Sequence, residues 1–188
     1  MTLLYRQLEH GRILNAALVQ MRERIGELEK LVDSDTLTPL YNRRRFIREL
    51  QATVEATRAG SRTASVMFID MDGLKSINDS HGHGAGDAAL VEVAQILLND
   101  SAPGDLVARI GGDEFAILMP DTGYEDAFAA AERICRAVKA HEAVVGDVRL
   151  ELSVSVGVAE LRPGDNVDTL LSRADEHMYA CRREARSN

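Results

Sequence analysis

The chain reads RIGGDEFAILM at residues 109–119. Apolar runs at 106–108 and 115–119 have the length of strands, so the pattern predicts a β-hairpin over this stretch. Gly111 and Gly112 permit a positive φ at the turn and let a ligand approach the backbone closely. The hairpin therefore presents two adjacent carboxylates, Asp113 and Glu114, at its tip.

A second apolar strand, expected from Ala64 to Asp70, also ends in acid, because residues 68–73 read FIDMDG. Two acidic strand ends side by side make an oxygen-rich site that suits Mg²⁺. Each of these carboxylates is alternatively a turn-forming or capping residue. We expect Asp72 and Asp79 to have only that structural role.

The composition restricts the class of protein. A length of 188 residues with 45% hydrophobic residues suits one domain plus an appendage. The net charge of −8 argues against a general nucleic-acid or membrane surface. Cys135 and Cys181 are expected to be reduced thiols, and the chain lacks a long apolar run and a secretory signal pattern, so we expect a soluble, cytoplasmic protein.

Residues 1–33 are expected to form a helical leader, separate from a globular domain at 34–188. Apolar residues recur at separations of 4, 3, 4, 3 and 4, which indicates a coiled-coil seam. β-Branched residues at two of the three a positions favour a parallel homodimer. The alternative is a helix that packs on its own domain. The seam residues are Leu14, Leu18, Met21, Ile25, Leu28 and Val32.

The order of the expected elements indicates an α/β fold of the α+β sandwich type. Strand and helix patterns follow in the order β-α-β-β-α-β, with an extra hairpin around Gly146 and Asp147. This order predicts a palm-like core with a mostly antiparallel sheet of about five strands and helices mainly on one face. Helices are expected at 43–59, 88–99, 124–141 and 167–186, strands at 64–70, 143–145 and 148–159, and the hairpin at 106–119.

The stretch from Gly73 to Asp87 is polar and rich in glycine, and we expect it to be a long loop between the first strand and a helix. A loop in this position commonly cradles a phosphate or a base. The alternative on the residues alone is a merely flexible loop.

Residues 111–115, GGDEF, are the signature of the GGDEF family, the bacterial diguanylate cyclases, and the chain resembles that family from about Asp33 to Asn188. Further motifs follow in the family's order and spacing at residues 35–46, 70–87 and 174–188. Pro39 stands where the family's entry motif usually has Gly. The resemblance implies that this entry segment links a signalling helix to the catalytic domain.

The resemblance also implies a reaction, in which two GTP molecules condense to cyclic di-GMP with release of two pyrophosphates. Asp70, Asp113 and the carbonyl of Met71 would hold Mg²⁺, with Mn²⁺ as the alternative ion and Glu114 as a further candidate ligand. Asp113 or Glu114 would help to deprotonate the attacking 3′-hydroxyl, and the resemblance favours Asp113. Lys75 would offset charge on the phosphates.

Other matched positions concern the nucleotide. Asn78 and Asp87 match the family's guanine readers, and a carboxylate that accepts from guanine N1–H argues for GTP over ATP. His83 matches a position near the ribose or base, or else it only structures its loop. Arg182 and Arg186 match phosphate-binding positions, although Arg182 stands where Lys is usual.

One departure concerns regulation. Family members often carry an inhibitory product site, R-x-x-D, shortly before the signature, and the corresponding residues here are Ala102 to Asp105. Because Ala102 replaces the arginine, we predict weak or absent feedback inhibition through this site.

The leading interpretation is therefore a dimeric bacterial diguanylate cyclase that is controlled through its N-terminal coil. Each chain would supply a half-site, and an upstream sensor domain or partner would fit before the coil. The competing interpretations are a non-catalytic module that binds GTP or cyclic di-GMP, a dimerisation adaptor, and a cyclase of another nucleotide. Intact acidic and guanine-reading residues argue against a degenerate site.

Overall fold

The structure is a computed structural model that describes residues 15, 18–21, 24, 32–58, 63–146 and 148–185. The chain divides into two compact units, Met1–Ser34 and Asp35–Asn188. In the first unit, the described residues up to Asp33 are helical, and Leu18, Met21 and Val32 are exposed. The rest of the seam lies outside the described residues, so the coiled coil stays a prediction.

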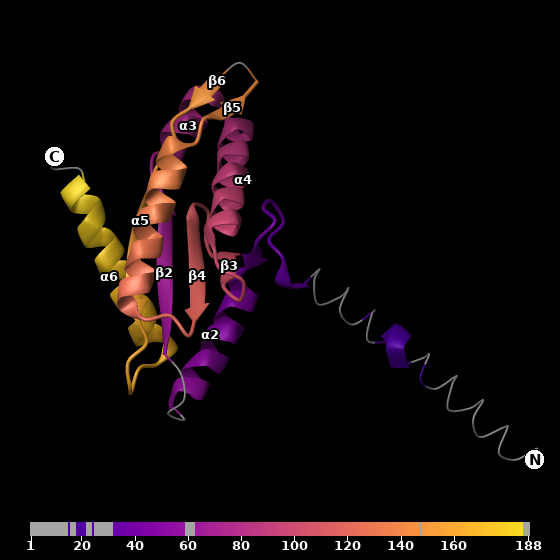
Figure 1. Cartoon of the computed structure of the whole chain (residues 1–188). Helices are drawn as coiled ribbons and strands as arrows, with labels where there is room; N and C mark the ends of the chain where they lie inside the picture. The colour runs from indigo at the N-terminus through magenta and orange to yellow at the C-terminus, as the bar shows by residue number, and fades with distance from the viewer. Residues whose placement is uncertain are drawn as a thin grey trace, which may run out of the picture. The chain divides into compact units, whose positions relative to one another are not determined.

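A five-stranded sheet forms the centre of the second unit (Figure 1). Its strand order is β1-β3-β4-β2-β7. Only the short β1 runs parallel to its neighbour β3, and the pairs β3–β4, β4–β2 and β2–β7 are antiparallel. The expectation of a mostly antiparallel sheet is confirmed. The strands are β1 (Tyr41–Asn42), β2 (Ala64–Met71), β3 (Leu106–Arg109), β4 (Glu114–Pro120) and β7 (Val154–Glu160).

Helices cover both faces of this sheet, which corrects the expectation that they lie mainly on one face. Met67 and Ile69 of β2 pack with α4 (His83–Asp100) and α5 (Tyr124–Ala140). Val66 and Phe68, which alternate with them along the strand, pack with α2 (Arg43–Arg58) and α6 (Val167–Ala185) on the other face. The physical reason is that β2 and β4 are apolar at nearly every position, as expected for strands that are buried on both faces.

The glycine-rich stretch is helical, which corrects the expectation of a long loop. Helix α3 (Leu74–His81) begins after Gly73, and α4 begins after Gly82, with φ of 74° and 83° at the two glycines. The glycines make the two bends, and the polar residues between them lie on the surface of a short helix. None of the eight residues of α3, all of which the structure describes, is buried.

The strand expected at 148–159 is interrupted, so this expectation was also wrong. Strand β6 (Val148–Leu150) pairs with β5 (Ala143–Val145) in a separate two-stranded sheet, and the main sheet resumes at β7. Leu150 and Leu152 are both buried. Ser153 lies between Leu152 and the start of β7, and its carbonyl accepts a hydrogen bond from the Asp72 backbone N–H at 2.9 Å.

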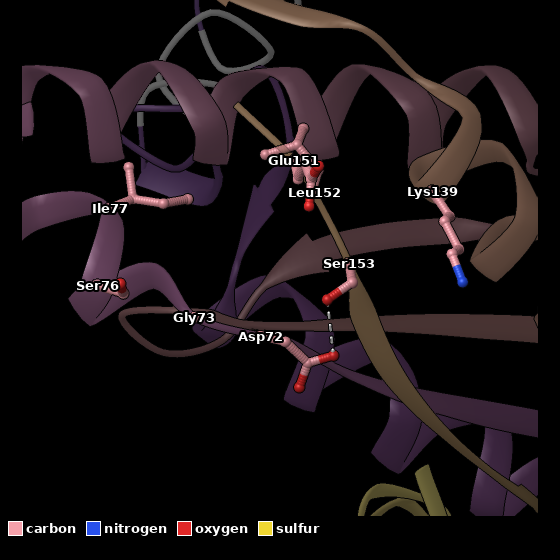
Figure 2. A pocket seen from close by; sticks show the side chains of 8 residues that line it. All are labelled: Asp72, Gly73, Ser76, Ile77, Lys139, Glu151, Leu152 and Ser153. Atoms are coloured by element: carbon pink, nitrogen blue, oxygen red, sulfur yellow. Dashed lines mark hydrogen bonds between the residues drawn. The ribbon is translucent and has the colours of Figure 1, made fainter. Parts of the chain in front are cut away.

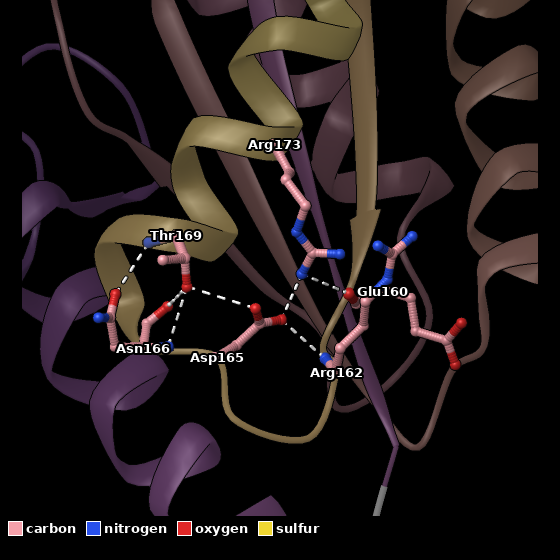
Figure 3. A network of polar contacts seen from close by, with 6 residues as sticks. All are labelled: Glu160, Arg162, Asp165, Asn166, Thr169 and Arg173. Atoms are coloured by element: carbon pink, nitrogen blue, oxygen red, sulfur yellow. Dashed lines mark hydrogen bonds and ion pairs between the residues drawn. The ribbon is translucent and has the colours of Figure 1, made fainter.

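Helix α6 lies directly on β7. A Cβ atom at Gly157 would lie 2.1 Å from the Ala174 carbonyl oxygen, so only glycine permits this approach. At the other end of the connection, Asp165 accepts from Arg173, and Arg173 also donates to the Glu160 carbonyl at 3.0 Å (Figure 3). These contacts hold the start of α6 on the sheet and thereby orient its C-terminal half.

Side chains cap the starts of α2 and α6, whereas α3, α4 and α5 begin without a side-chain cap. Asn42 accepts a hydrogen bond from the Arg45 backbone N–H, so it is the expected N-cap of α2. Asn166 accepts from the Thr169 N–H, and Thr169 Oγ1 accepts from the Asn166 N–H, which caps α6 (Figure 3). None of the helices in the described part of the chain is long and apolar enough to cross a membrane.

Candidate active site

Three strand ends meet at one edge of the sheet and bring the acidic residues together. In the sheet register, Asp70 of β2 faces Glu114 of β4 on one side and Ser155 of β7 on the other. The Met71 N–H donates to the Asp113 carbonyl at 2.9 Å, which holds the signature loop against the end of β2. The hairpin tip and the end of the first strand are therefore neighbours, as the sequence predicts.

Asp70 is the most enclosed of these carboxylates, with an exposed fraction of 9%. Burial raises its pKa above the ordinary value, Arg182 opposes this rise, and Asp113, Asp72 and Glu114 add to it. Its Oδ1 atom accepts no well-aligned hydrogen bond from the described residues. A buried carboxylate oxygen of this kind favours a bound cation.

The donor set fits a magnesium ion that arrives with a nucleotide. Among the described residues, no three His, Cys, Asp or Glu side chains form a ready-made cage. Mg²⁺ commonly uses only one or two carboxylates and completes its coordination with water and substrate phosphates. Asp70, Asp113 and the Met71 carbonyl, at the neighbouring ends of β2 and β4, offer oxygen donors of the type that this mode of binding uses.

A cavity of about 510 Å³ lies beside the signature loop and collects the residues predicted to bind nucleotide. Asp113 lines it from the loop, and α3 and α4 supply the other walls. Its lining residues are Leu74, Lys75, Asn78, Asp79, His83, Gly86, Asp87, Leu90, Arg109, Gly112 and Asp113. Five of the predicted residues thus share one cavity, and Asp79, expected to be only structural, lines it too.

The close crossing of α3 and α4 places Asn78 beside Asp87. A Cβ atom at Gly86 would lie 2.0 Å from Asn78 Oδ1. Glycine at this position therefore leaves room for the Asn78 amide against the first turn of α4. The two candidate guanine readers come to one wall through this contact.

Glu114 faces a different cavity from Asp113. Adjacent residues of a strand point to opposite faces of a sheet, and Glu114 lines a cavity of about 270 Å³ with Phe46 and Phe68 on the side of α2 and α6. Its carboxylate folds over Gly111, where a Cβ atom would lie 2.2 Å from Oε2. Of the two candidate bases, Asp113 is the one that lines the cavity of about 510 Å³ beside α3 and α4.

Arg109 is a site residue that sequence reasoning missed. Its Nε and Nη2 atoms donate to the Gly112 carbonyl at 3.2 and 2.8 Å, and its Nη1 atom lies 3.2 Å from Asp35 Oδ1. Asp35 also accepts from the Thr38 N–H and hydroxyl, each at 2.8 Å. Although burial raises the pKa of Asp35, these hydrogen bonds and Arg109 outweigh it and leave the pKa lowered.

Arg182 lies over the acidic strand ends and does not line the cavity of about 510 Å³. Its Nη1 atom is 2.9 Å from Asp70 Oδ1, and its Nε atom is 3.3 Å from Asp72 Oδ1. Asp72 was expected to be only a turn residue, and its role as a partner of Arg182 was missed. Two chain positions so far apart give no local signal of this pairing. Arg186 lies outside the described residues.

Asp72 also borders a cavity of about 680 Å³, which Gly73 and Ser76 line as well (Figure 2). Ser153 donates to Asp72 Oδ2 at 3.2 Å, and Ser155 donates to Oδ1 at 2.9 Å. Lys139 and Glu151 line the same cavity. The hydroxyl donors fix the Asp72 carboxylate at the border between this cavity and the strand ends.

The residues at the position of the family's inhibitory site form a closed turn. Asp105 Oδ2 accepts from the Ala102 N–H at 2.8 Å, and the Asp105 N–H donates to the Ala102 carbonyl at 3.0 Å. Burial raises the pKa of Asp105, although the Ala102 hydrogen bond and Arg133 oppose the rise. The Asp105 carboxylate is thus engaged with its own turn.

Comparison with known proteins identifies the family. The family model described as "Diguanylate cyclase, GGDEF domain" matches residues 32–188. Response regulator PleD of Caulobacter vibrioides is 37% identical over 170 residues, or 89% of this chain and 37% of the relative. Diguanylate cyclase DgcM of Escherichia coli is 35% identical over 161 residues, or 86% of this chain and 38% of the relative. The chain spans less than half the length of these curated relatives.

Solved structures agree in fold. Diguanylate cyclase SiaD of Pseudomonas aeruginosa, in complex with its activator SiaC, has a TM-score of 0.86 at 32% identity, covering 96% of this chain and 70% of that chain. The coiled coil and GGDEF domain of DgcB from Caulobacter crescentus, in complex with c-di-GMP, has a TM-score of 0.83 at 29% identity, covering 90% and 91%. The signature residues lie where three strand ends meet. The family match over residues 32–188 and the identity to these relatives show that this chain belongs to the GGDEF family of diguanylate cyclases.

Proposed function

We propose that this chain is an active diguanylate cyclase that condenses two GTP molecules to cyclic di-GMP. Each 3′-hydroxyl attacks the α-phosphorus of the other GTP. A new P–O bond forms, the bond to the β-phosphate breaks, and pyrophosphate leaves. The single observation that carries the proposal is the nucleotide cavity, in which Asn78 and Asp87 face the same space as Asp113.

Guanine recognition is assigned to the far wall of that cavity. The Asp87 carboxylate accepts from guanine N1–H and the exocyclic amine, and the Asn78 amide pairs with the remaining polar edge. Adenine lacks the first pair of donors, so its binding would leave Asp87 unpaired. His83 is assigned to the ribose side, on the same lining.

The phosphates are assigned to the wall beside the signature loop. Asp70, Asp113 and the Met71 carbonyl would hold Mg²⁺, or Mn²⁺ in its place, and the ion neutralises the phosphates when it is bound. Lys75 lines the same cavity and adds positive charge there. Arg182 and Arg186 are assigned to the terminal phosphate.

The proton of the 3′-hydroxyl is assigned to Asp113. This residue lines the cavity that is proposed to hold GTP, whereas Glu114 lines the cavity on the other face of the sheet. We assign Glu114 a supporting role through its charge beside Asp70. An Asp113 variant should therefore lose turnover more completely than a Glu114 variant.

Catalysis is assigned to a homodimer. One cavity of about 510 Å³ holds one GTP, so the attacking hydroxyl of one nucleotide must be brought to the phosphate of another. A two-fold arrangement of chains supplies both half-sites. We propose that the leader at residues 1–33 pairs as a parallel coil and sets their relative angle, and that a sensor domain or partner acts through it.

The test is incubation of the purified chain with GTP and Mg²⁺, followed by chromatographic separation of the nucleotides. Asp113→Ala should make no cyclic di-GMP. Glu132→Ala is the matched control, because it removes a carboxylate from the exposed face of α5, outside the site. Tight GTP binding by a dimeric parent without any product would refute the proposal and favour a non-catalytic nucleotide-binding module.

A further inference from the structure

Arg182 bridges the candidate metal ligand Asp70 and its neighbour Asp72. The guanidinium lies 2.9 Å from Asp70 and 3.3 Å from Asp72, and the three side chains are 26%, 12% and 29% exposed. We propose that Arg182 is a stand-in cation: it neutralises Asp70 in the metal-free chain and is released towards the nucleotide phosphates when the metal takes its place. This inference rests on the proposed function for the identity of the nucleotide.

The charge balance explains why a resident cation is needed. Asp70 is enclosed, and the negative charges of Asp113, Asp72 and Glu114 all act on it. Neighbouring carboxylates whose charges act on one another in this way repel unless a cation lies between them. Arg182 is the cation that forms ion pairs with Asp70 and Asp72 in the described part of the chain. It thereby stabilises the strand ends before any metal is bound.

The metal and Arg182 compete for one atom. Asp70 Oδ1 is the oxygen that Arg182 Nη1 contacts, and it is also a buried oxygen with no well-aligned hydrogen bond among the described residues. A metal ion bound to this oxygen repels the guanidinium because both are positively charged, and it occupies the space in which the guanidinium lies, so the guanidinium must leave. Binding of the metal alone is therefore weakened by Arg182.

Asp72 retains the displaced guanidinium. Its carboxylate is fixed by the hydroxyl groups of Ser153 and Ser155, at 3.2 and 2.9 Å. The ion pair of Arg182 Nε with Asp72 Oδ1 at 3.3 Å, which is not a well-aligned hydrogen bond, can persist while Nη1 leaves Asp70. A guanidinium has five N–H donors in a planar fork, so one edge can stay on Asp72 while another turns to phosphate oxygens. A lysine at this position has one charged atom and cannot divide its contacts in this way.

The exchange predicts effects of opposite sign in one variant. Without Arg182, the metal no longer has to displace a cation, so metal binding in the absence of nucleotide should tighten. The same variant loses a phosphate contact, so binding of the metal–nucleotide complex should weaken. A purely structural role of Arg182 would weaken both.

The experiment compares Arg182→Gln with Arg183→Gln in the full chain. Arg183 is exposed on the same helix, so its substitution removes the same formal charge one residue away. Mn²⁺ is the metal probe, and the loss of its free-ion EPR signal gives the dissociation constant without nucleotide. The nucleotide probe is 3′-deoxy-GTP with Mg²⁺, titrated by calorimetry, because it lacks the attacking hydroxyl and cannot condense.

Arg182→Gln should bind Mn²⁺ about three- to tenfold more tightly than the parent, as expected for the loss of a competing charge at a partly buried site. It should bind Mg²⁺–3′-deoxy-GTP about tenfold more weakly, since a charge-assisted phosphate contact is lost. Arg182→Lys should lie between the parent and Arg182→Gln in Mn²⁺ affinity. Arg183→Gln should match the parent in both titrations.

The inference is overturned if Arg182→Gln binds Mn²⁺ with unchanged or lower affinity, or if Arg183→Gln tightens it equally. Unchanged binding of 3′-deoxy-GTP would overturn the release towards phosphate. These results are separate from the proposed function. If Arg182→Gln shows both effects relative to the parent but the parent makes no cyclic di-GMP, only the proposed cyclase activity is refuted. If the parent makes cyclic di-GMP but Arg182→Gln shows neither effect, only the proposed exchange of Arg182 for the metal is refuted.

Discussion

Gly86 is the position at which a single methyl group should separate ligand binding from fold stability. A Cβ atom there would lie 2.0 Å from Asn78 Oδ1 and 2.9 Å from Asn78 Cγ, whereas ordinary contacts begin at 3.4 Å. In Gly86→Ala the Asn78 amide must therefore retreat by more than 1 Å, to judge from these distances. That displacement is larger than a hydrogen bond to guanine can tolerate.

The expected magnitude follows from the lost contact. A polar group left unpaired in a binding site costs about 1–3 kcal/mol, so the dissociation constant for Mg²⁺–3′-deoxy-GTP should rise about five- to 150-fold. The fold should be affected far less. Alanine is favoured over glycine in a helix by about 0.5–1 kcal/mol. This gain in the free energy of unfolding offsets the cost of moving the Asn78 side chain.

Gly84 provides the matched control. It lies in the same first turn of α4, and a Cβ atom there would meet nothing within 4 Å. Gly84→Ala should gain the helix-propensity stabilisation and leave the dissociation constant unchanged. Calorimetry for the nucleotide and urea denaturation for the fold measure both quantities. Nucleotide binding by Gly86→Ala as tight as that by Gly84→Ala would refute the assignment of Asn78 to the base.

Three further predictions concern other parts of the site. Asp35→Ala should cost about 1–2 kcal/mol in urea denaturation at pH 7, because it removes the cap on Thr38 and the partner of Arg109. The pKa of Asp35 in the folded chain is lowered below 3.8, so its contribution to the free energy of unfolding is present above pH 3.8 and is lost as the pH falls through the folded pKa. The free energies of unfolding of parent and variant should therefore become equal in acid. A constant difference between them down to the lowest pH would contradict this. Asp72→Asn should weaken binding of Mg²⁺–3′-deoxy-GTP about threefold or more, since Arg182 loses its second anchor, and calorimetry showing parental affinity would contradict that role. Titration with cyclic di-GMP should inhibit turnover only weakly, because Ala102 has no guanidinium, and strong inhibition at low micromolar product would refute this prediction.

Local patterns in the sequence were enough to locate the acidic strand ends. Asp70 and Asp113 each follow or precede an apolar run, and a carboxylate at the end of such a run must lie at the edge of a sheet. The antiparallel pairing that joins them is between β2 and β4, which are separated in the chain by α3, α4 and β3, so it is not part of the hairpin of β3 and β4. Fold class and family could be predicted from these stretches because the signals lie within a few residues of one another.

The errors arose where the outcome depends on long-range packing. The glycines at 73 and 82 were interpreted as loop residues, although each only bends the chain beside a short helix. A continuous apolar strand does not say whether one face or both will be covered, so α2 and α6 on the second face were not expected. The strand expected at 148–159 is divided because its first part pairs with β5 and its last part pairs with β2, and these two pairings belong to separate sheets.

Arg109 as a site residue and the ion pairs of Arg182 were missed, because the partners of both arginines are distant in sequence. Arg109 reaches back to Asp35, and Arg182 reaches back to Asp70 and Asp72. Sequence spacing placed Arg182 on a phosphate-binding position but could not show which carboxylates it contacts before a nucleotide arrives. The ion pairs of the folded chain were needed for that.

The most direct test of the central claim is the quantity of each product released from GTP and Mg²⁺ by the parent and by Asp113→Ala, with the oligomeric state of both measured alongside. A diguanylate cyclase releases two pyrophosphates for each cyclic di-GMP, so we expect this ratio from the dimeric parent and neither product from the variant. A dimer that binds GTP and leaves it unconverted, or a variant that still forms cyclic di-GMP, would contradict it.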